Sequence, residues 1–338
     1  MKKILLFCFI TAMIACTPTK QSTIDTTLQT KVDSILQNKM SEIGAISGQT
    51  IVMEVQTGEI KTMVGNGISQ ESGLIRTASL LTALETSKVK LSDTVDVGEG
   101  VYMVHDRELL DHNWHRGGYG KLTTLQGLMV NSHIANYKNI ERAFTEEQAY
   151  FDMLDKMNYG QPDNIEGLDS LKAAYFVTPN DSGWSNTSLA WFCIGYNQRI
   201  SPIQMLTFYN AIANNGKMVK PTLYKGETEV INPQIASKAN IDSLQMALVK
   251  VVTEGLGKPA QSEKVQVAGV SGGGQLSTDE DNSEGRVNTI YSVEYCGYFP
   301  AENPKYSIIV SMNKVGLPAS GNLMAGSVFK DIVDYMTK

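Results

Sequence analysis

Cysteine, histidine and charge are all scarce in this sequence. It has four cysteines and four histidines among 338 residues, and none of them falls in a spacing typical of a zinc site. We therefore expect no metal and no cofactor. Charged residues make up 19% of the chain and the formal net charge is −6, which argues against disorder and against nucleic acid as a partner. With 42% hydrophobic residues, the chain can bury the core of an ordinary globular protein.

The N-terminus has the features of a segment that is removed after export. Two lysines precede an apolar run, Ile4 to Ala12, which is too short to span a bilayer. The following Met-Ile-Ala-Cys resembles the lipobox of bacterial lipoproteins, which implies a lipoprotein signal peptide at residues 1–15 and lipidation of Cys16. A plain secretory signal with an incidental cysteine is the alternative.

Lipidation would give a periplasmic protein that is attached to a membrane by its acyl chains. The stretch after Cys16 is polar and then helical in pattern, so residues 16–44 are expected to form a tether and a first amphipathic helix. Thr17 and Pro18 carry no acidic group that would suggest retention at the inner membrane. This favours the outer membrane, if the cell has one.

The hydrophobic pattern of residues 45–338 predicts one α/β domain. Two strand-like runs flank a turn at residues 56–59, and a helix that is apolar on most sides covers Glu71 to Glu85. Further helices are expected at residues 123–143, 145–157, 202–214, 240–254 and 323–336, and strands at 265–268, 292–298 and 306–313. This order predicts an antiparallel sheet flanked by helices, with a mostly helical lobe inserted between residues 91 and 231.

Two cysteines lie inside this domain, Cys193 and Cys296, and both stand among aromatic and apolar residues. They are expected to be small buried hydrophobes, although an oxidising compartment would also allow them to pair. The histidines lie in loop-like segments and are expected in loops and at the surface: His105, His112, His115 and His133.

Four stretches carry a family resemblance: GQTIVMEVQTGEIKTMVG (48–65), RGGYGKLTTLQGLMVNSHIAN (116–136), SPIQM followed by IANNG and KP (201–221), and GYFPAENPKYSI (297–308). They resemble the transpeptidase domain of class B penicillin-binding proteins. This resemblance runs from about residue 48 to the end of the sequence. It implies a serine transpeptidase fold with three motifs: Ser-x-x-Lys at a helix start, a Ser-x-Asn loop, and Lys-Thr-Gly on a strand beside the cleft. Members usually carry a large N-terminal module as well, which we do not expect here.

The first motif has lost both of its catalytic groups. Aligned on its downstream apolar pattern and its Thr-Ala-Leu-Glu end, the helix at 71–85 places Gly73 at the nucleophile and Arg76 at the lysine. Glycine has no side-chain oxygen, and arginine keeps its proton and cannot act as a base. Ser72 is no substitute, because a shift of one residue would rotate every core residue of the helix by about 100°. Other Ser-x-x-Lys pairs, at 87–90, 311–314 and 327–330, do not start a cleft-facing helix.

The second motif corresponds to Asn131, Ser132 and His133, where the family has Ser-x-Asn. The relay hydroxyl and the substrate-binding amide are therefore both replaced. Asn131 and His133 can still hydrogen-bond a ligand, or they are ordinary loop residues.

The third motif corresponds to VAGVSGGGQ, residues 267–275. Val270 replaces the lysine, Ser271 keeps a hydroxyl in place of threonine, and Gly272 is retained. Gly273 follows at the position whose backbone N–H would help to form an oxyanion hole. The glycine run lacks the sequence of a phosphate-binding loop, so it indicates a strand at the edge of the cleft that has lost its charge.

These changes predict a catalytically inactive homologue, a pseudoenzyme that binds peptidoglycan stem peptides or cell-wall synthesis proteins without covalent chemistry. A strand edge beside a cleft can pair with an extended peptide through main-chain hydrogen bonds. Two alternatives stay open. One is an active DD-transpeptidase or carboxypeptidase with a displaced nucleophile, and the other is an interaction scaffold whose cleft is plugged by Arg76.

Overall fold

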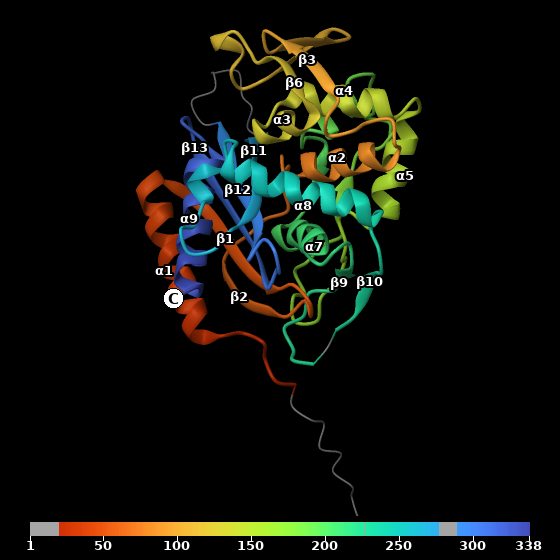
Figure 1. Cartoon of the computed structure of the whole chain (residues 1–338). Coiled ribbons are helices and arrows are strands. Elements are labelled where there is room, and N and C mark those ends of the chain that lie inside the picture. The colour runs from red at the N-terminus through yellow and green to blue at the C-terminus, as the bar shows by residue number, and fades with distance from the viewer. Residues whose placement is uncertain (1–19, 227, 277–288) are drawn as a thin grey trace, which may run out of the picture.

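A five-stranded antiparallel sheet forms the centre of the computed structural model, which describes residues 20–226, 228–276 and 289–338 (Figure 1). The strand order is β11-β12-β13-β1-β2, so β11 and β2 are the two edges of the sheet. Its strands are β1 (Ala45–Glu54), β2 (Ile60–Gly65), β11 (Ala268–Leu276), β12 (Ile290–Phe299) and β13 (Tyr306–Val315). The β1–β2 turn falls at the predicted residues, where Gly58 adopts a φ of 79°.

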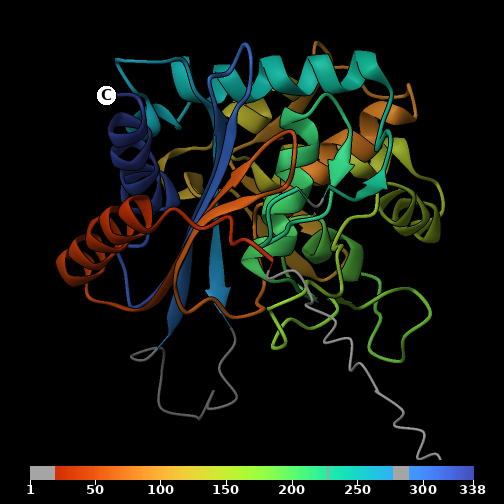
Figure 2. The same ribbon diagram turned by 90° about the horizontal axis from the view of Figure 1, so that it is seen from below.

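Helices cover both sides of this sheet (Figure 2). On one side lie α1 (Thr26–Ile43) and α9 (Gly321–Met336), and on the other α2 (Ile75–Glu85), α7 (Pro202–Ala213) and α8 (Lys238–Thr253). Each side has its own hydrophobic core. Because both faces are covered, β12 and β13 are buried along most of their length instead of alternating. The fold class predicted from the sequence is confirmed.

The inserted lobe packs around α2 and extends beyond the end of the sheet (Figure 1). Its helices are α3 (Thr124–Met129), α4 (His133–Ala143), α5 (Glu147–Lys156) and α6 (Ser188–Phe192). Four two-stranded pairs accompany them: β3 (Thr94–Gly98) with β6 (Gly120–Thr123), β4 (Val101–Val104) with β5 (Arg107–Leu110), β7 (Tyr175–Phe176) with β8 (Gln198–Arg199), and β9 (Met218–Val219) with β10 (Val230–Asn232). The pattern of the sequence did not predict these short strands, because a pair of two to five residues leaves little periodicity.

Two further predicted boundaries were wrong at places that matter for function, besides the start of α2, which begins at Ile75 and not at Glu71. The helix expected over residues 123–143 is broken in two, because Asn131 takes a left-handed φ of 55° and Ser132 starts α4 as its N-cap. The strand expected at residues 265–268 begins only at Ala268 and runs on through the three glycines. Pairing with the apolar strand β12 holds these glycines in the sheet.

Both domain cysteines, Cys193 and Cys296, are buried and free. Burial raises the pKa of each thiol, so both stay protonated at neutral pH. Within the described residues, no helix is long and apolar enough to cross a bilayer. The predicted signal peptide and Cys16 lie outside the described residues.

Candidate ligand-binding cleft

A cleft of about 660 Å³ lies along the free edge of β11. Residues 271–275 of β11 form one wall, and Asn131 and His133 of the α3–α4 segment form another. The loop before α9 and the first turn of that helix add an apolar rim with Leu317 and Leu323. Arg76, from the first turn of α2, also lines the cleft.

Gly73 lies just before α2 and directly against β11. A Cβ atom at this position would be 2.7 Å from the carbonyl oxygen of Gly273 and 3.1 Å from its amide nitrogen. On its other side, the backbone N–H of Ser72 donates a 3.1 Å hydrogen bond to the carbonyl of Gly195. Gly73 is therefore enclosed between two backbone segments and does not line the cleft. Any side chain here would force β11 to move.

Ser72 points away from the cleft. Its hydroxyl donates a 2.6 Å hydrogen bond to Oε2 of Glu294 on β12, and both side chains are buried. Gln70 and Ser311 donate longer bonds to Oε1 of the same carboxylate. Burial raises the pKa of Glu294 above its usual value, and these donors oppose that rise. Ser72 is thus a part of a polar network inside the sheet.

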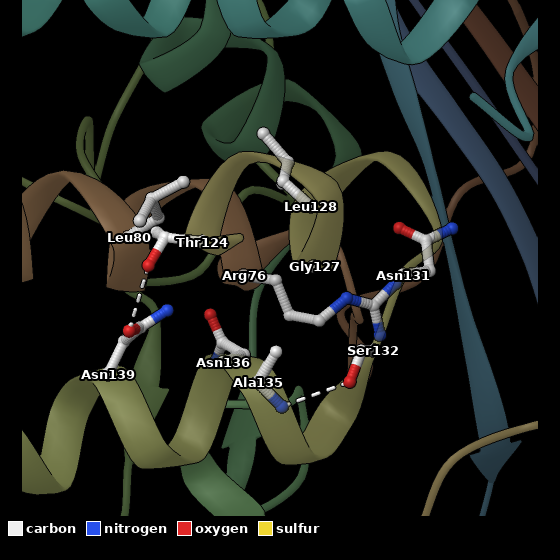
Figure 3. A pocket seen from close by; sticks show the side chains of 10 residues that line it. All are labelled: Arg76, Leu80, Thr124, Gly127, Leu128, Asn131, Ser132, Ala135, Asn136 and Asn139. Carbon is white, nitrogen blue, oxygen red and sulfur yellow. Dashed lines mark hydrogen bonds between the residues drawn. The ribbon is translucent and has the colours of Figure 1, made fainter. Parts of the chain in front are cut away.

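Arg76 carries a positive charge into the interior. Its side chain leaves α2 and passes between α3 and α4 toward Asn131 and Ser132, as Figure 3 shows. The side chain is buried, with 6% of the residue exposed. Nη2 donates a 3.3 Å hydrogen bond to the carbonyl of Ser271, and Nε has no partner in the described ranges. Burial lowers the pKa of the guanidinium, while the more distant carboxylates of Asp111 and Glu294 raise it.

Asn131 joins the lobe to the sheet across the inner end of the cleft. Its Nδ2 donates a 2.8 Å hydrogen bond to Oγ of Ser271 on β11. Its Oδ1 is buried and has no partner among the described residues. The left-handed backbone at Asn131 turns the side chain toward β11, and asparagine tolerates that conformation better than most residues. The Asn131–Ser271 bond thus connects the second and third motif positions.

Ser132 and His133 differ in their surroundings. Ser132 caps α4, accepts the N–H of Ala135 at 3.0 Å and donates to the buried carboxylate of Asp111 at 2.7 Å, so its role is to hold the loop. His133 is half-buried and lines the cleft, which corrects the expectation that it lies at the surface. Burial and the charge of Arg76 lower its pKa to about 3, so the ring is neutral at pH 7. Nδ1 bonds to the carbonyl of Leu110 at 3.0 Å, which makes it the protonated nitrogen and leaves Nε2 as an acceptor.

The positions of the third motif are divided between the core and the cleft. Val270 is buried in the hydrophobic core and does not line the cleft. Ser271, Gly272 and Gly273 do line it. Gly273 has a φ of 145°, a conformation that favours glycine, and a Cβ there would lie 2.6 Å from the carbonyl oxygen of Ser292. The cleft therefore presents backbone and one hydroxyl where a lysine would otherwise supply charge.

Several other polar groups of the cleft have structural partners, but Oδ1 of Asn322 is buried and has none among the described residues. Ser292 donates to the carbonyl of Gly274 at 3.4 Å, and Ser320 caps α9. His112 bonds to the hydroxyl of Tyr119 at 3.0 Å and to the carbonyl of Val130. In the described residues, no histidine of the cleft hydrogen-bonds to a serine hydroxyl. No three His, Cys, Asp or Glu side chains of this part of the chain gather closely enough to hold a metal ion.

Sequence reasoning missed several residues of this region. His112, Tyr196 and the leucines of the rim come from segments far from the three motifs, and only folding brings them to the cleft. Asp111 and Glu294 belong to none of the three sequence motifs. Glu294 does stand in an otherwise apolar strand run, SVEYCGYF, which is the one local sign that it is buried.

Comparisons with known proteins identify the family of this fold. The family model of the penicillin binding protein transpeptidase domain matches residues 48–334. Penicillin-binding protein PbpB of Mycolicibacterium smegmatis is 23% identical over 368 residues, which cover 94% of this chain and 54% of the relative. Peptidoglycan D,D-transpeptidase FtsI of Escherichia coli K12 is 22% identical over 306 residues, which cover 84% and 49%. The chain spans about half the length of these curated relatives.

Among solved structures, the transpeptidase domain of Burkholderia pseudomallei penicillin-binding protein 3 matches with a TM-score of 0.80 at 21% identity, over 93% of this chain and 95% of that one. The fold is therefore that of a transpeptidase domain of a penicillin-binding protein. The chain belongs to the penicillin-binding protein transpeptidase family, as the match over residues 48–334 shows.

Proposed function

We propose that this protein is a catalytically inactive member of the family, held at the cell envelope as a lipoprotein, which binds peptidoglycan stem peptides or cell-wall synthesis proteins non-covalently. One observation carries the proposal. The residue that aligns with the nucleophile is Gly73, and the backbone of Gly273 leaves no room for a side chain there. Covalent catalysis needs a nucleophile beside a base that can take its proton.

Among the residues that the structure describes, the hydroxyl groups of the cleft give no substitute pair of nucleophile and base. Ser271 accepts a bond from Asn131, which is an amide and not a base. His133 uses Nδ1 on the carbonyl of Leu110, and no hydrogen bond joins its ring to a serine in the described residues. These contacts argue against an active transpeptidase or carboxypeptidase with a displaced nucleophile.

The position of β11 supports peptide binding. It is an edge strand, so one side of its backbone has no partner strand, and residues 271–275 border the cleft. An extended peptide can add to such an edge through main-chain hydrogen bonds, and no nucleophile is required. The alternative of an interaction scaffold whose cleft is plugged by Arg76 fits less well, because a cleft volume of about 660 Å³ remains beside the buried Arg76 side chain.

Intact-mass measurement after incubation with benzylpenicillin tests the loss of catalysis. We expect the full chain to keep its unmodified mass under conditions that acylate an active family member completely. A stable mass increase that disappears when a single serine is replaced would identify a displaced nucleophile and contradict the proposal. Titration with a stem-peptide fragment, followed by calorimetry, tests the binding function.

A further inference from the structure

Within the part of the chain that the structure describes, the guanidinium of Arg76 is a buried cation without a counter-charge at hydrogen-bonding distance. Among these residues its one hydrogen bond goes to a neutral carbonyl, that of Ser271, and its Nε has no partner. Taking a charge out of water is costly unless an opposite charge or several hydrogen bonds replace the water. Asp111 and Glu294 act on Arg76 only through longer-range electrostatics, and each is already hydrogen-bonded elsewhere. An anion bound beside Arg76 would supply the missing counter-charge.

The rest of the cleft leaves Arg76 as its single fixed charge. Among the described residues that line the cleft, Arg76 is the only lysine or arginine, and none is aspartate or glutamate. The neighbouring His133 is neutral at pH 7 and adds no charge. One positive charge suits a singly charged group better than a phosphate, which carries more negative charge and usually meets several donors.

The apolar rim of the cleft indicates which groups the ligand carries next to its anionic end. Leu317 and Leu323 are 71% and 65% exposed and stand at the mouth of the cleft, so the ligand covers apolar surface next to its charged end. The edge of β11 offers main-chain groups along one wall. An extended peptide that ends in a free carboxylate and carries small or apolar residues satisfies all three features.

We propose that Arg76 binds the terminal carboxylate of a peptide that lies along β11, at the place where an active relative would have its catalytic lysine. The inference rests on the proposed peptide-binding function and adds what the cleft selects. Val270 cannot supply charge from the third motif, because it is buried in the core. Recognition of the carboxylate therefore passes to the first motif, with Asn131 Nδ2 and Ser271 holding that end of the cleft together.

A matched pair of probes tests this assignment: diacetyl-L-Lys-D-Ala-D-Ala with a free carboxylate, and the same peptide with a C-terminal amide. We expect the full chain to bind the acid at least about tenfold more tightly than the amide, because a guanidinium binds a carboxylate through charge-assisted hydrogen bonds. The comparison uses the unchanged protein, so it does not depend on how well a variant folds.

Arg76→Gln should remove the difference between acid and amide, and Arg76→Lys should retain part of it as the charge-keeping control. Equal binding of the two peptides by the unchanged protein would overturn the role of Arg76 and leave the peptide-binding function standing. The same holds for an acid preference that survives in Arg76→Gln. Failure of both peptides to bind would contradict the stem-peptide part of the proposed function, and this inference with it.

Discussion

Ser72 and Glu294 form a 2.6 Å hydrogen bond between two buried side chains that are 222 residues apart in the sequence. The bond fastens the segment before α2 to β12, the second strand of the sheet. Ser72→Ala should therefore lower the free energy of unfolding by about 1.5–3 kcal/mol, the usual cost of losing a hydrogen bond to a charged group. Ser311→Ala is the control, because its bond to the same carboxylate is longer, at 3.3 Å. If urea unfolding gives the same loss of unfolding free energy for both variants, the short bond contributes no more to stability than the long one.

Glu294 also predicts a pH dependence of stability. Burial raises its pKa in the folded protein above the ordinary value of 4.5. Below pH 4.5 the group is protonated in both states, and its contribution to stability is complete. That contribution is lost as the pH rises through the raised folded-state pKa. The melting temperature of the unchanged protein should therefore fall relative to that of Glu294→Gln as the pH rises above 4.5, and a constant difference would contradict the assignment.

Restoring the first motif should not restore catalysis. In the double variant Gly73→Ser with Arg76→Lys, the new Cβ would lie 2.7 Å from the carbonyl oxygen of Gly273, and Val270 would still supply no charge. We expect penicillin to acylate this double variant incompletely. In the single variant Gly73→Ser, overpacking should lower the free energy of unfolding by about 1–3 kcal/mol. Mass spectrometry and urea unfolding measure the two effects. Rapid, complete acylation would show that β11 moves aside easily.

The glycines of β11 differ in what they tolerate. Gly273→Ala should cost at least about 1–3 kcal/mol, because the φ of 145° and a contact of 2.6 Å with the carbonyl of Ser292 both oppose a side chain. Gly274→Ala is the matched control, since the nearest atom to its Cβ, the hydroxyl of Tyr196, is 3.7 Å away. We expect it to change stability by less than about 0.5 kcal/mol. Similar melting temperatures for the two variants would contradict this reading of the strand.

Membrane attachment should depend on Cys16. Replacing it with serine removes the thiol that would carry the lipid, and acyl chains contribute about 0.8 kcal/mol for each buried methylene. We expect Cys16→Ser to fold normally and to leave the membrane fraction. Thermal melting serves as the folding control. If the variant stays with membranes after its signal peptide has been removed, a bound partner and not the lipid holds the protein there.

The sequence predicts the large elements of the fold because each buries an apolar face with a clear period. The buried helix at α2 and the strands β12 and β13 are examples, although α2 begins at Ile75, four residues later than expected. The three motif segments could also be located, through their resemblance to the family.

The geometry between those segments could not be predicted. The Asn131–Ser271 bond joins residues 140 positions apart, and the contact between Gly73 and Gly273 depends on how closely β11 approaches the start of α2. Local periodicity describes one segment at a time and contains no such distances. For the same reason Ser132 and Val270, which the motifs nominate for the cleft, have structural roles instead.

Because residue 76 is an arginine, its charge in the cleft does not change with the pH around the protein. A lysine buried as deeply would lose its proton more readily, and its charge would then vary with the pH around the protein. Although burial lowers the pKa of Arg76, a guanidinium starts so high that it stays protonated throughout the range in which bacteria live. His133 stays neutral over almost the same range, because its pKa is about 3. The charge state of the cleft is therefore the same at mildly acidic and at neutral pH.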